Sequence, residues 1–144
     1  ASSSAWRWRS VAARRGPLVT AHGDFAPWNL RRGAAGLYAF DWEYGWSGAA
    51  PVHDLFHLLL APRALRRRPP NPPLMRRVVA AAQEYLEDTY PRWRWTGGAA
   101  AALALQYLLD TILFYGAADG FVDQRHPVVA AYLRTIEGRA LWMR

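Results

Sequence analysis

The residues best suited to chemistry lie in one short stretch near the start of the chain. Residues 22–29 read His-Gly-Asp-Phe-Ala-Pro-Trp-Asn, and Asp-Trp-Glu follows at 41–43. A carboxylate can accept the proton of an attacking hydroxyl, whereas a second carboxylate and an amide oxygen suit Mg²⁺. The order and spacing therefore predict phosphoryl transfer from a nucleotide, with Asp24 as catalytic base and with Asn29 and Asp41 holding Mg²⁺ against the phosphates.

The type of ligand favours magnesium over zinc. Asn29 and Asp41 offer hard oxygen donors, and the chain has no Cys and no cluster of His. Asp41 also ends an apolar run, where an unpaired buried carboxylate would be costly, so a cation or a charged partner is expected beside it.

Three motifs together resemble a known family. His-Gly-Asp-x₄-Asn, the apolar run ending in Asp-Trp-Glu, and Pro-x-x-Asp-Leu at 51–55 are similar to the aminoglycoside phosphotransferase and choline kinase branch of the kinase-like superfamily. Gly23 stands where protein kinases carry Arg, and Trp42-Glu43 where they carry Phe-Gly. The resemblance covers residues 18–60. It implies a C-terminal catalytic lobe that transfers the γ-phosphoryl of ATP or GTP to a hydroxyl-bearing small substrate.

The resemblance also implies supporting residues around the loop. His22 would support it through hydrogen bonds and packing, and the Asp54 carboxylate would accept hydrogen bonds from its backbone N–H groups. Glu43 is either close to the metal or a surface acid. His53 and His57 have the i, i+4 spacing of metal ligands, but without a third ligand nearby they are expected to be an ordinary core or surface pair.

The residues that hold a nucleotide in such kinases are missing. The chain has 18 Arg and no Lys, no Gly-rich loop precedes His22, and only 21 residues lie before it. We therefore expect residues 1–144 to form a single partial domain, the C-terminal lobe, whose missing partner is a Lys-bearing N-terminal lobe. Residues 1–16 would be the tail of a preceding helix, and the lobe alone would be inactive.

The composition indicates a globular protein. Hydrophobic residues make up 52% of the chain, with 8 Trp and 7 Tyr, and the absence of Cys excludes a disulfide framework. No secretory signal is visible, and Ala99 to Leu109 is too short and too weakly apolar to span a bilayer, so a cytoplasmic protein without a membrane partner is expected. The net charge of +7 lacks a nucleic-acid motif, so nucleic acid is not expected as a partner. The alternative function is a non-catalytic, Arg- and Trp-rich helical domain that binds an anionic partner.

The predicted fold is α+β and mostly α, in the manner of a kinase-like C-terminal lobe: a short strand, a small β-hairpin and about four helices. Glycines at 33 and 36 favour a hairpin turn that brings Asn29 and Asp41 together. The expected elements are a strand at 18–21, hairpin strands at 29–32 and 37–40, a helix from Pro51 to about Pro62, a loop at 63–73, a helix capped by Asn71 and ending near Tyr90, a helix at 99–118 and a helix from Pro127 toward Trp142.

The phosphoryl acceptor is left open. Asp110, in the middle of an apolar helix, either points into an acceptor cleft or is buried and paired with an Arg. A chain at +7 is a poor match for a strongly cationic acceptor, so neutral sugars, amino alcohols and other hydroxyl compounds remain alternatives.

Overall fold

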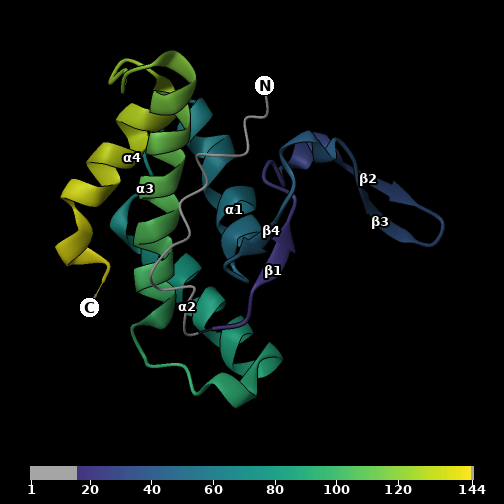
Figure 1. Cartoon of the computed structure of the whole chain (residues 1–144). Helices are drawn as coiled ribbons and strands as arrows, with labels where there is room; N and C mark the ends of the chain where they lie inside the picture. Colours follow the sequence, from purple (N-terminus) through teal and green to yellow (C-terminus); the bar gives the residue numbers. More distant parts are fainter. Residues whose placement is uncertain (1–15, 144) are drawn as a thin grey trace.

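The computed structural model describes residues 16–143 and is α+β, mostly helical (Figure 1). The expected helical tail at 1–16 thus lies almost wholly outside the described residues. The described helices form one body on which a smaller β region sits; they are α1 (His53–Leu65), α2 (Pro72–Thr89), α3 (Ala99–Asp119) and α4 (Pro127–Glu137). The β region consists of β1 (Val19–Ala21), β2 (Leu30–Gly33), β3 (Gly36–Ala39) and β4 (Trp46–Ala49).

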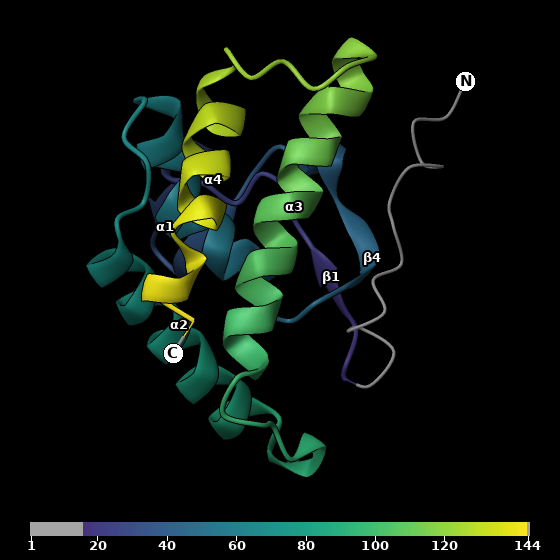
Figure 2. The ribbon, with the colours of Figure 1, turned by 90° about the vertical axis from the view of Figure 1, so that its left-hand side faces the viewer.

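The core lies between the helices. In α2 the buried residues recur every three or four positions, at Met75, Val78, Ala82 and Leu86, which is the period of one helix face. Helices α3 and α4 run side by side (Figure 2) and both pack against α1. Each of the four helices contributes buried apolar side chains to one continuous cluster.

The end of α1 differs from the sequence prediction, whereas the start of α2 agrees with it. Helix α1 continues through Pro62 to Leu65, whereas a loop was predicted from Arg63. Pro62 lacks a backbone N–H, so α1 continues to Leu65 with the hydrogen bond that this N–H would have made missing. The predicted cap of α2 is confirmed, because the Asn71 side chain accepts a hydrogen bond of 3.0 Å from the Leu74 backbone N–H.

Helix α3 is long and apolar enough, over Ala99–Gly116, to meet the length and composition of a membrane span. In this fold it packs against α1, α2 and α4, and 44% of that stretch is buried. The sequence predicted a buried core helix. The structure shows a half-covered one, with Leu109, Leu113 and Phe114 exposed.

Strand β4 was not predicted. It pairs antiparallel with β1, and the ladder shifts register between Val19 and Thr20. Gly48, at φ 89°, is the residue of β4 left without a partner, which is the mark of a β-bulge. A Ser-Gly pair has little strand propensity, so this strand exists because β1 is available to pair with it.

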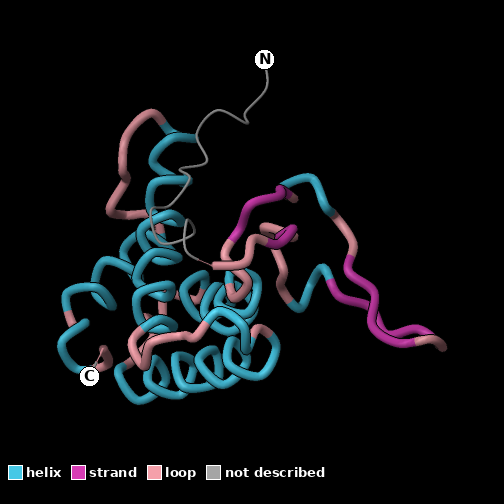
Figure 3. Tube along the Cα trace, turned by 60° about the horizontal axis from the view of Figure 1, so that its bottom comes forward, coloured by secondary structure: helices cyan, strands magenta, loops and turns pink. Residues whose placement is uncertain are grey.

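Strands β2 and β3 form a β-hairpin with a two-residue turn, and the hairpin projects from the helical body (Figures 1 and 3). Gly33 pairs with Gly36, and Gly36 has φ 135°, which a residue with a side chain rarely adopts. Large apolar side chains are exposed on and after the hairpin, including Leu37, Phe40 and Trp42 at 64%, 52% and 53%. Several exposed apolar side chains on one projecting element are a feature that another polypeptide often covers.

We expect the chain to self-associate at micromolar concentration through this hairpin. Replacing both Leu37 and Phe40 with Ser should shift the sedimentation coefficient toward that of a monomer, because it removes exposed apolar area. The control is Leu109→Ser on α3, whose side chain is also exposed. Equal sedimentation of the wild type and the double variant would exclude the hairpin as the associating surface.

Candidate functional site

The backbone at the start of the loop at residues 22–29, called the His22–Asn29 loop below, is held by one carboxylate. Asp54, in the first turn of α1, accepts hydrogen bonds from the backbone N–H groups of His22 at 2.7 Å and Gly23 at 3.2 Å. These are the hydrogen bonds predicted for Asp54 from the sequence. They attach the backbone of the loop to α1 without using any side chain of the loop.

Gly23 can only be a glycine in this loop. Its φ is 87°, and a Cβ atom there would collide with the backbone carbonyl of Tyr44. The close approach brings the Asp41-Trp42-Glu43 segment against the His22–Asn29 loop. It gives a physical reason for glycine at position 23.

His22 is a buried support, as predicted. Its Nε2 donates to the carbonyl of Phe40 at 2.6 Å, and its Nδ1 accepts from the backbone N–H of Asp24 at 3.3 Å. The ring lies 4.6 Å from that of Trp42, centroid to centroid. Because Phe40 N–H in turn donates to the Asn29 carbonyl at 2.9 Å, His22 connects the His22–Asn29 loop to the base of the hairpin.

Three side chains donate hydrogen bonds to the carboxylate of Asp24, which is 30% exposed. Asn29 Nδ2 donates to Oδ2 at 2.8 Å, and Trp28 Nε1 donates to the same oxygen at 3.2 Å. His57 Nε2 lies 3.0 Å from Oδ1. The predicted base is therefore held in a defined orientation at a partly open surface.

The contact from His57 was missed by the sequence analysis, which expected His53 and His57 to be an ordinary pair. His57 lies one helical turn after Asp54, so a helix face that meets the loop at Asp54 also meets it at His57. The other ring nitrogen of His57 lies 3.1 Å from the hydroxyl of Tyr107. His53 instead packs its ring against those of Trp46 and Tyr107.

The backbones of the two predicted metal ligands, Asn29 and Asp41, lie close together in space. Asn29 is paired with Phe40, the residue before Asp41. The Asn29 amide nitrogen donates to the backbone carbonyl and the carboxylate of Asp24, and neither bond uses the amide oxygen. Asp41 is in the left-handed region at φ 62°, a sparsely populated conformation that often marks functional positions.

Burial does not force a cation onto Asp41, as the sequence analysis expected. Both Asp41 and the strand before it are largely exposed, so no desolvation cost requires a partner. Within residues 16–143, no group of three or more His, Cys, Asp or Glu side chains is placed to hold a metal. A carboxylate and an amide suit Mg²⁺ only where phosphate and water oxygens complete its octahedron, which is how Mg²⁺ is usually held with nucleotides.

A row of aromatic rings lies near Asp24. Tyr44 contacts Phe114, which contacts Tyr115, and Tyr115 lies 4.1 Å from the ring of His126. Burial raises the pKa of Tyr115, and the Asp24 charge raises it further. Exposed Glu43, the residue left ambiguous above, is the largest cause of the raised pKa of Tyr44.

Asp110 is half-buried on α3, and burial raises the pKa of its carboxyl group while a hydrogen bond from Gln106 lowers it. Gln106 Nε2 donates to it at 3.1 Å. An Arg partner, one of the two alternatives for Asp110, is not found within ion-pair distance among the described side chains. Whether Asp110 faces an acceptor stays a prediction.

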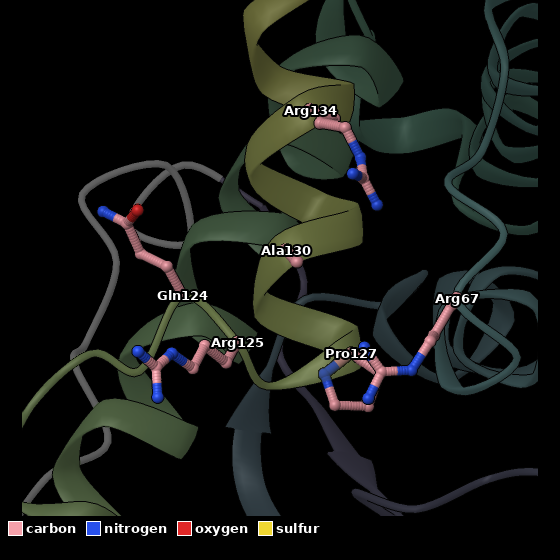
Figure 4. Close-up of a pocket in the computed structure, with 6 residues that line it drawn as sticks. All are labelled: Arg67, Gln124, Arg125, Pro127, Ala130 and Arg134. Atoms are coloured by element: carbon pink, nitrogen blue, oxygen red, sulfur yellow. The ribbon is translucent and has the colours of Figure 1, made fainter.

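A separate cavity of about 540 Å³ is strongly basic (Figure 4). Its lining comes from the α1–α2 connection, the α3–α4 connection and α4, and comprises Arg67, Gln124, Arg125, Pro127, Ala130 and Arg134. Within the described part of the chain none of these Arg side chains pairs with a carboxylate. The cavity therefore brings three positively charged side chains, Arg67, Arg125 and Arg134, to one lining.

Comparison with known proteins identifies no relative: no family model, no curated protein and no solved structure matches the chain.

Asp54→Ala should lower the free energy of unfolding by about 1–3 kcal/mol, because it leaves the N–H groups of His22 and Gly23 without an acceptor. Urea denaturation followed by circular dichroism measures the change. Asp54→Asn keeps one acceptor oxygen and should lose less. An Ala variant as stable as the wild type would show that the loop does not depend on Asp54.

Stability should also depend on pH through His57. Burial lowers its pKa in the folded chain, against smaller raising effects from Asp24 and Asp54. Between that pKa and the unfolded value of about 6.5, the unfolded chain binds a proton that the folded chain does not. The wild type should therefore lose stability relative to His57→Gln as the pH falls below about 6.5. Urea unfolding of both proteins from pH 7.5 to 5 tests this, and parallel curves would contradict it.

Proposed function

We propose that this chain is the catalytic lobe of a small-molecule phosphotransferase, a kinase that moves the γ-phosphoryl of ATP or GTP to a substrate hydroxyl. The observation that supports it most is the Asp24 carboxylate, which Asn29 and His57 orient within a loop tied down by Asp54. Catalysis of phosphoryl transfer depends largely on positioning and on charge neutralisation.

Each proposed role follows from position. Asp24, partly exposed, would accept the proton of the acceptor hydroxyl. Asn29 and Asp41 would hold Mg²⁺, which neutralises phosphate charge when it is bound. Gly23 packs against Tyr44 and His22 bonds Phe40, and these contacts of the loop with the residues on either side of Asp41 support a site shared by the three residues.

The acceptor would meet the aromatic row. Tyr44 and Phe114 are exposed at 42% and 47%, and Trp28, which bonds Asp24 directly, at 44%. A hydroxyl compound with an apolar face fits such rings better than a polycation fits a chain of net charge +7. The exposed hairpin would lie against the Lys-bearing lobe, and the enzyme would work in the cytoplasm.

A second candidate function is a binding domain for an anionic partner. The cavity between Arg67, Arg125 and Arg134 favours it, because no described carboxylate lies within ion-pair distance of these charges. The DNA upstream of Ala1 separates the two candidates. An in-frame strand with Lys and a phosphate-binding loop supports the kinase, whereas a start codon close to Ala1 supports the binding domain.

The enzyme should be tested with that upstream sequence included. Phosphoryl transfer from ATP and GTP to aminoglycosides, amino alcohols and neutral sugars is measured for the wild type, Asp24→Asn and Asp41→Ala. Asp24→Asn should lower kcat by about 10²-fold or more and leave nucleotide binding intact. Asp41→Ala should abolish the Mg²⁺-dependent part of nucleotide binding in a calorimetric titration.

Residues 1–144 alone serve as the control and should show little nucleotide affinity and no turnover. Turnover by these residues alone would overturn the need for a second lobe. A near-normal kcat for Asp24→Asn would overturn the assignment of the base.

A further inference from the structure

A chain of hydrogen bonds runs from Asp24 into the helical core. Behind the Asp24 carboxylate, His57 Nε2 lies 3.0 Å from Oδ1 and His57 Nδ1 lies 3.1 Å from the Tyr107 hydroxyl. That hydroxyl lies 3.0 Å from the hydroxyl of Tyr132. Tyr107 and Tyr132 are at most 2% exposed, and the His57 side chain is 12% exposed. Roles for Asp24, Asn29 and Asp41 alone leave this buried chain unexplained.

The donors and acceptors available give these hydrogen bonds one direction of donation. An ionised Asp24 carboxylate only accepts hydrogen bonds, so His57 Nε2 must carry a proton. Burial lowers the pKa of His57, which favours the neutral ring with Nδ1 as an acceptor. Tyr107 then donates to Nδ1 and accepts from Tyr132. In this arrangement the Tyr107 hydroxyl holds the imidazole in one tautomer, and the Tyr132 hydroxyl holds that of Tyr107.

The two oxygens of Asp24 are not equivalent. Oδ1 is held from the buried side by His57, whereas Oδ2 accepts from Asn29 and from exposed Trp28. The contact from Trp28, at 3.2 Å, is the longest of the three and the closest to solvent. A substrate hydroxyl would therefore meet Oδ2 from the side of Trp28.

We propose that His57 is a positioning residue for the Asp24 base: its Nε2–H fixes the plane of the carboxylate so that Oδ2 faces the acceptor hydroxyl, and Tyr107 and Tyr132 hold the imidazole in the tautomer this requires. The inference rests on the proposed phosphotransferase function. The proton taken from the acceptor stays on Asp24, because the series of hydrogen bonds behind it ends at Tyr132. The Tyr132 hydroxyl has no further hydrogen bond among the described residues.

The tautomer is tested first, in the 144-residue chain. Long-range ¹H–¹⁵N correlation spectra at pH 7.5 report which ring nitrogen of His57 carries the proton, and Nε2 is expected. Tyr107→Phe should change the Nδ1 chemical shift, because it removes the donor to that atom. Tyr132→Phe should change that shift less, because the Tyr132 hydroxyl reaches His57 only through the Tyr107 hydroxyl. A proton on Nδ1 in the wild type would overturn the inference.

The effect on catalysis is tested in the enzyme that includes the upstream sequence. His57→Leu should lower kcat by about 10- to 100-fold with little change in the KM for nucleotide, because it releases the carboxylate without touching the nucleotide site. His57→Gln places an amide N–H where Nε2 lies and should restore much of kcat. His57→Asn carries the same amide but is one methylene too short to reach Asp24, and should resemble His57→Leu.

The outcomes separate this inference from the proposed function. If the wild type is active and His57→Leu keeps its kcat, or if His57→Gln and His57→Asn are equally impaired although folded by circular dichroism, the positioning role is wrong and the function stands. If the wild type transfers no phosphoryl group to any acceptor while the spectra show the expected tautomer, the function fails and the positioning role fails with it, leaving a structural contact.

Discussion

The candidate site depends on the bidentate use of one carboxylate. Asp54 lies in helix α1 of the helical body, and its carboxylate accepts hydrogen bonds from the backbone of the His22–Asn29 loop. Without it the N–H groups of His22 and Gly23 would have to find other acceptors, and the loop would lose its fixed distance from α1. His57 can reach Asp24 only because that distance is fixed, so the orientation of the proposed base derives from Asp54.

A second constraint is the contact between two loops that carry different parts of the site. Gly23 packs on the backbone of Tyr44, and His22 bonds the carbonyl of Phe40. Both contacts are made by backbone or by buried groups, so they hold the Asp41 segment near Asn29 even though Asp41 itself is exposed. Exposed side chains in this arrangement are supported by buried ones, which suits a site that must bind and release ligands.

Local patterns in the sequence predicted the elements whose causes are local. The spacing of apolar residues predicted α2, Asn71 predicted its cap, and the glycines around Ala34-Ala35 predicted the hairpin. The motif around Asp54 predicted the hydrogen bonds to the loop. Strand β4 and the Asp24–His57 contact could not be predicted in this way, because each depends on a partner far away in the chain. The apolar strand before Asp41 was expected to be buried, but it is largely exposed because the hairpin projects from the body (Figure 3). Burial therefore does not require a cation at Asp41.

The pairing of β1 with β4 closes a loop of chain that runs from residue 22 to residue 45 and contains Asp24, Asn29 and Asp41. Such a closed segment behaves as one cooperative unit in native-state amide exchange, because separating the strands at its base releases everything between them. The proposed base and metal ligands would then share a single opening free energy, well below that of the helical core. His57 belongs to the core, so each closing of the segment would return Asp24 to an anchor that had not moved.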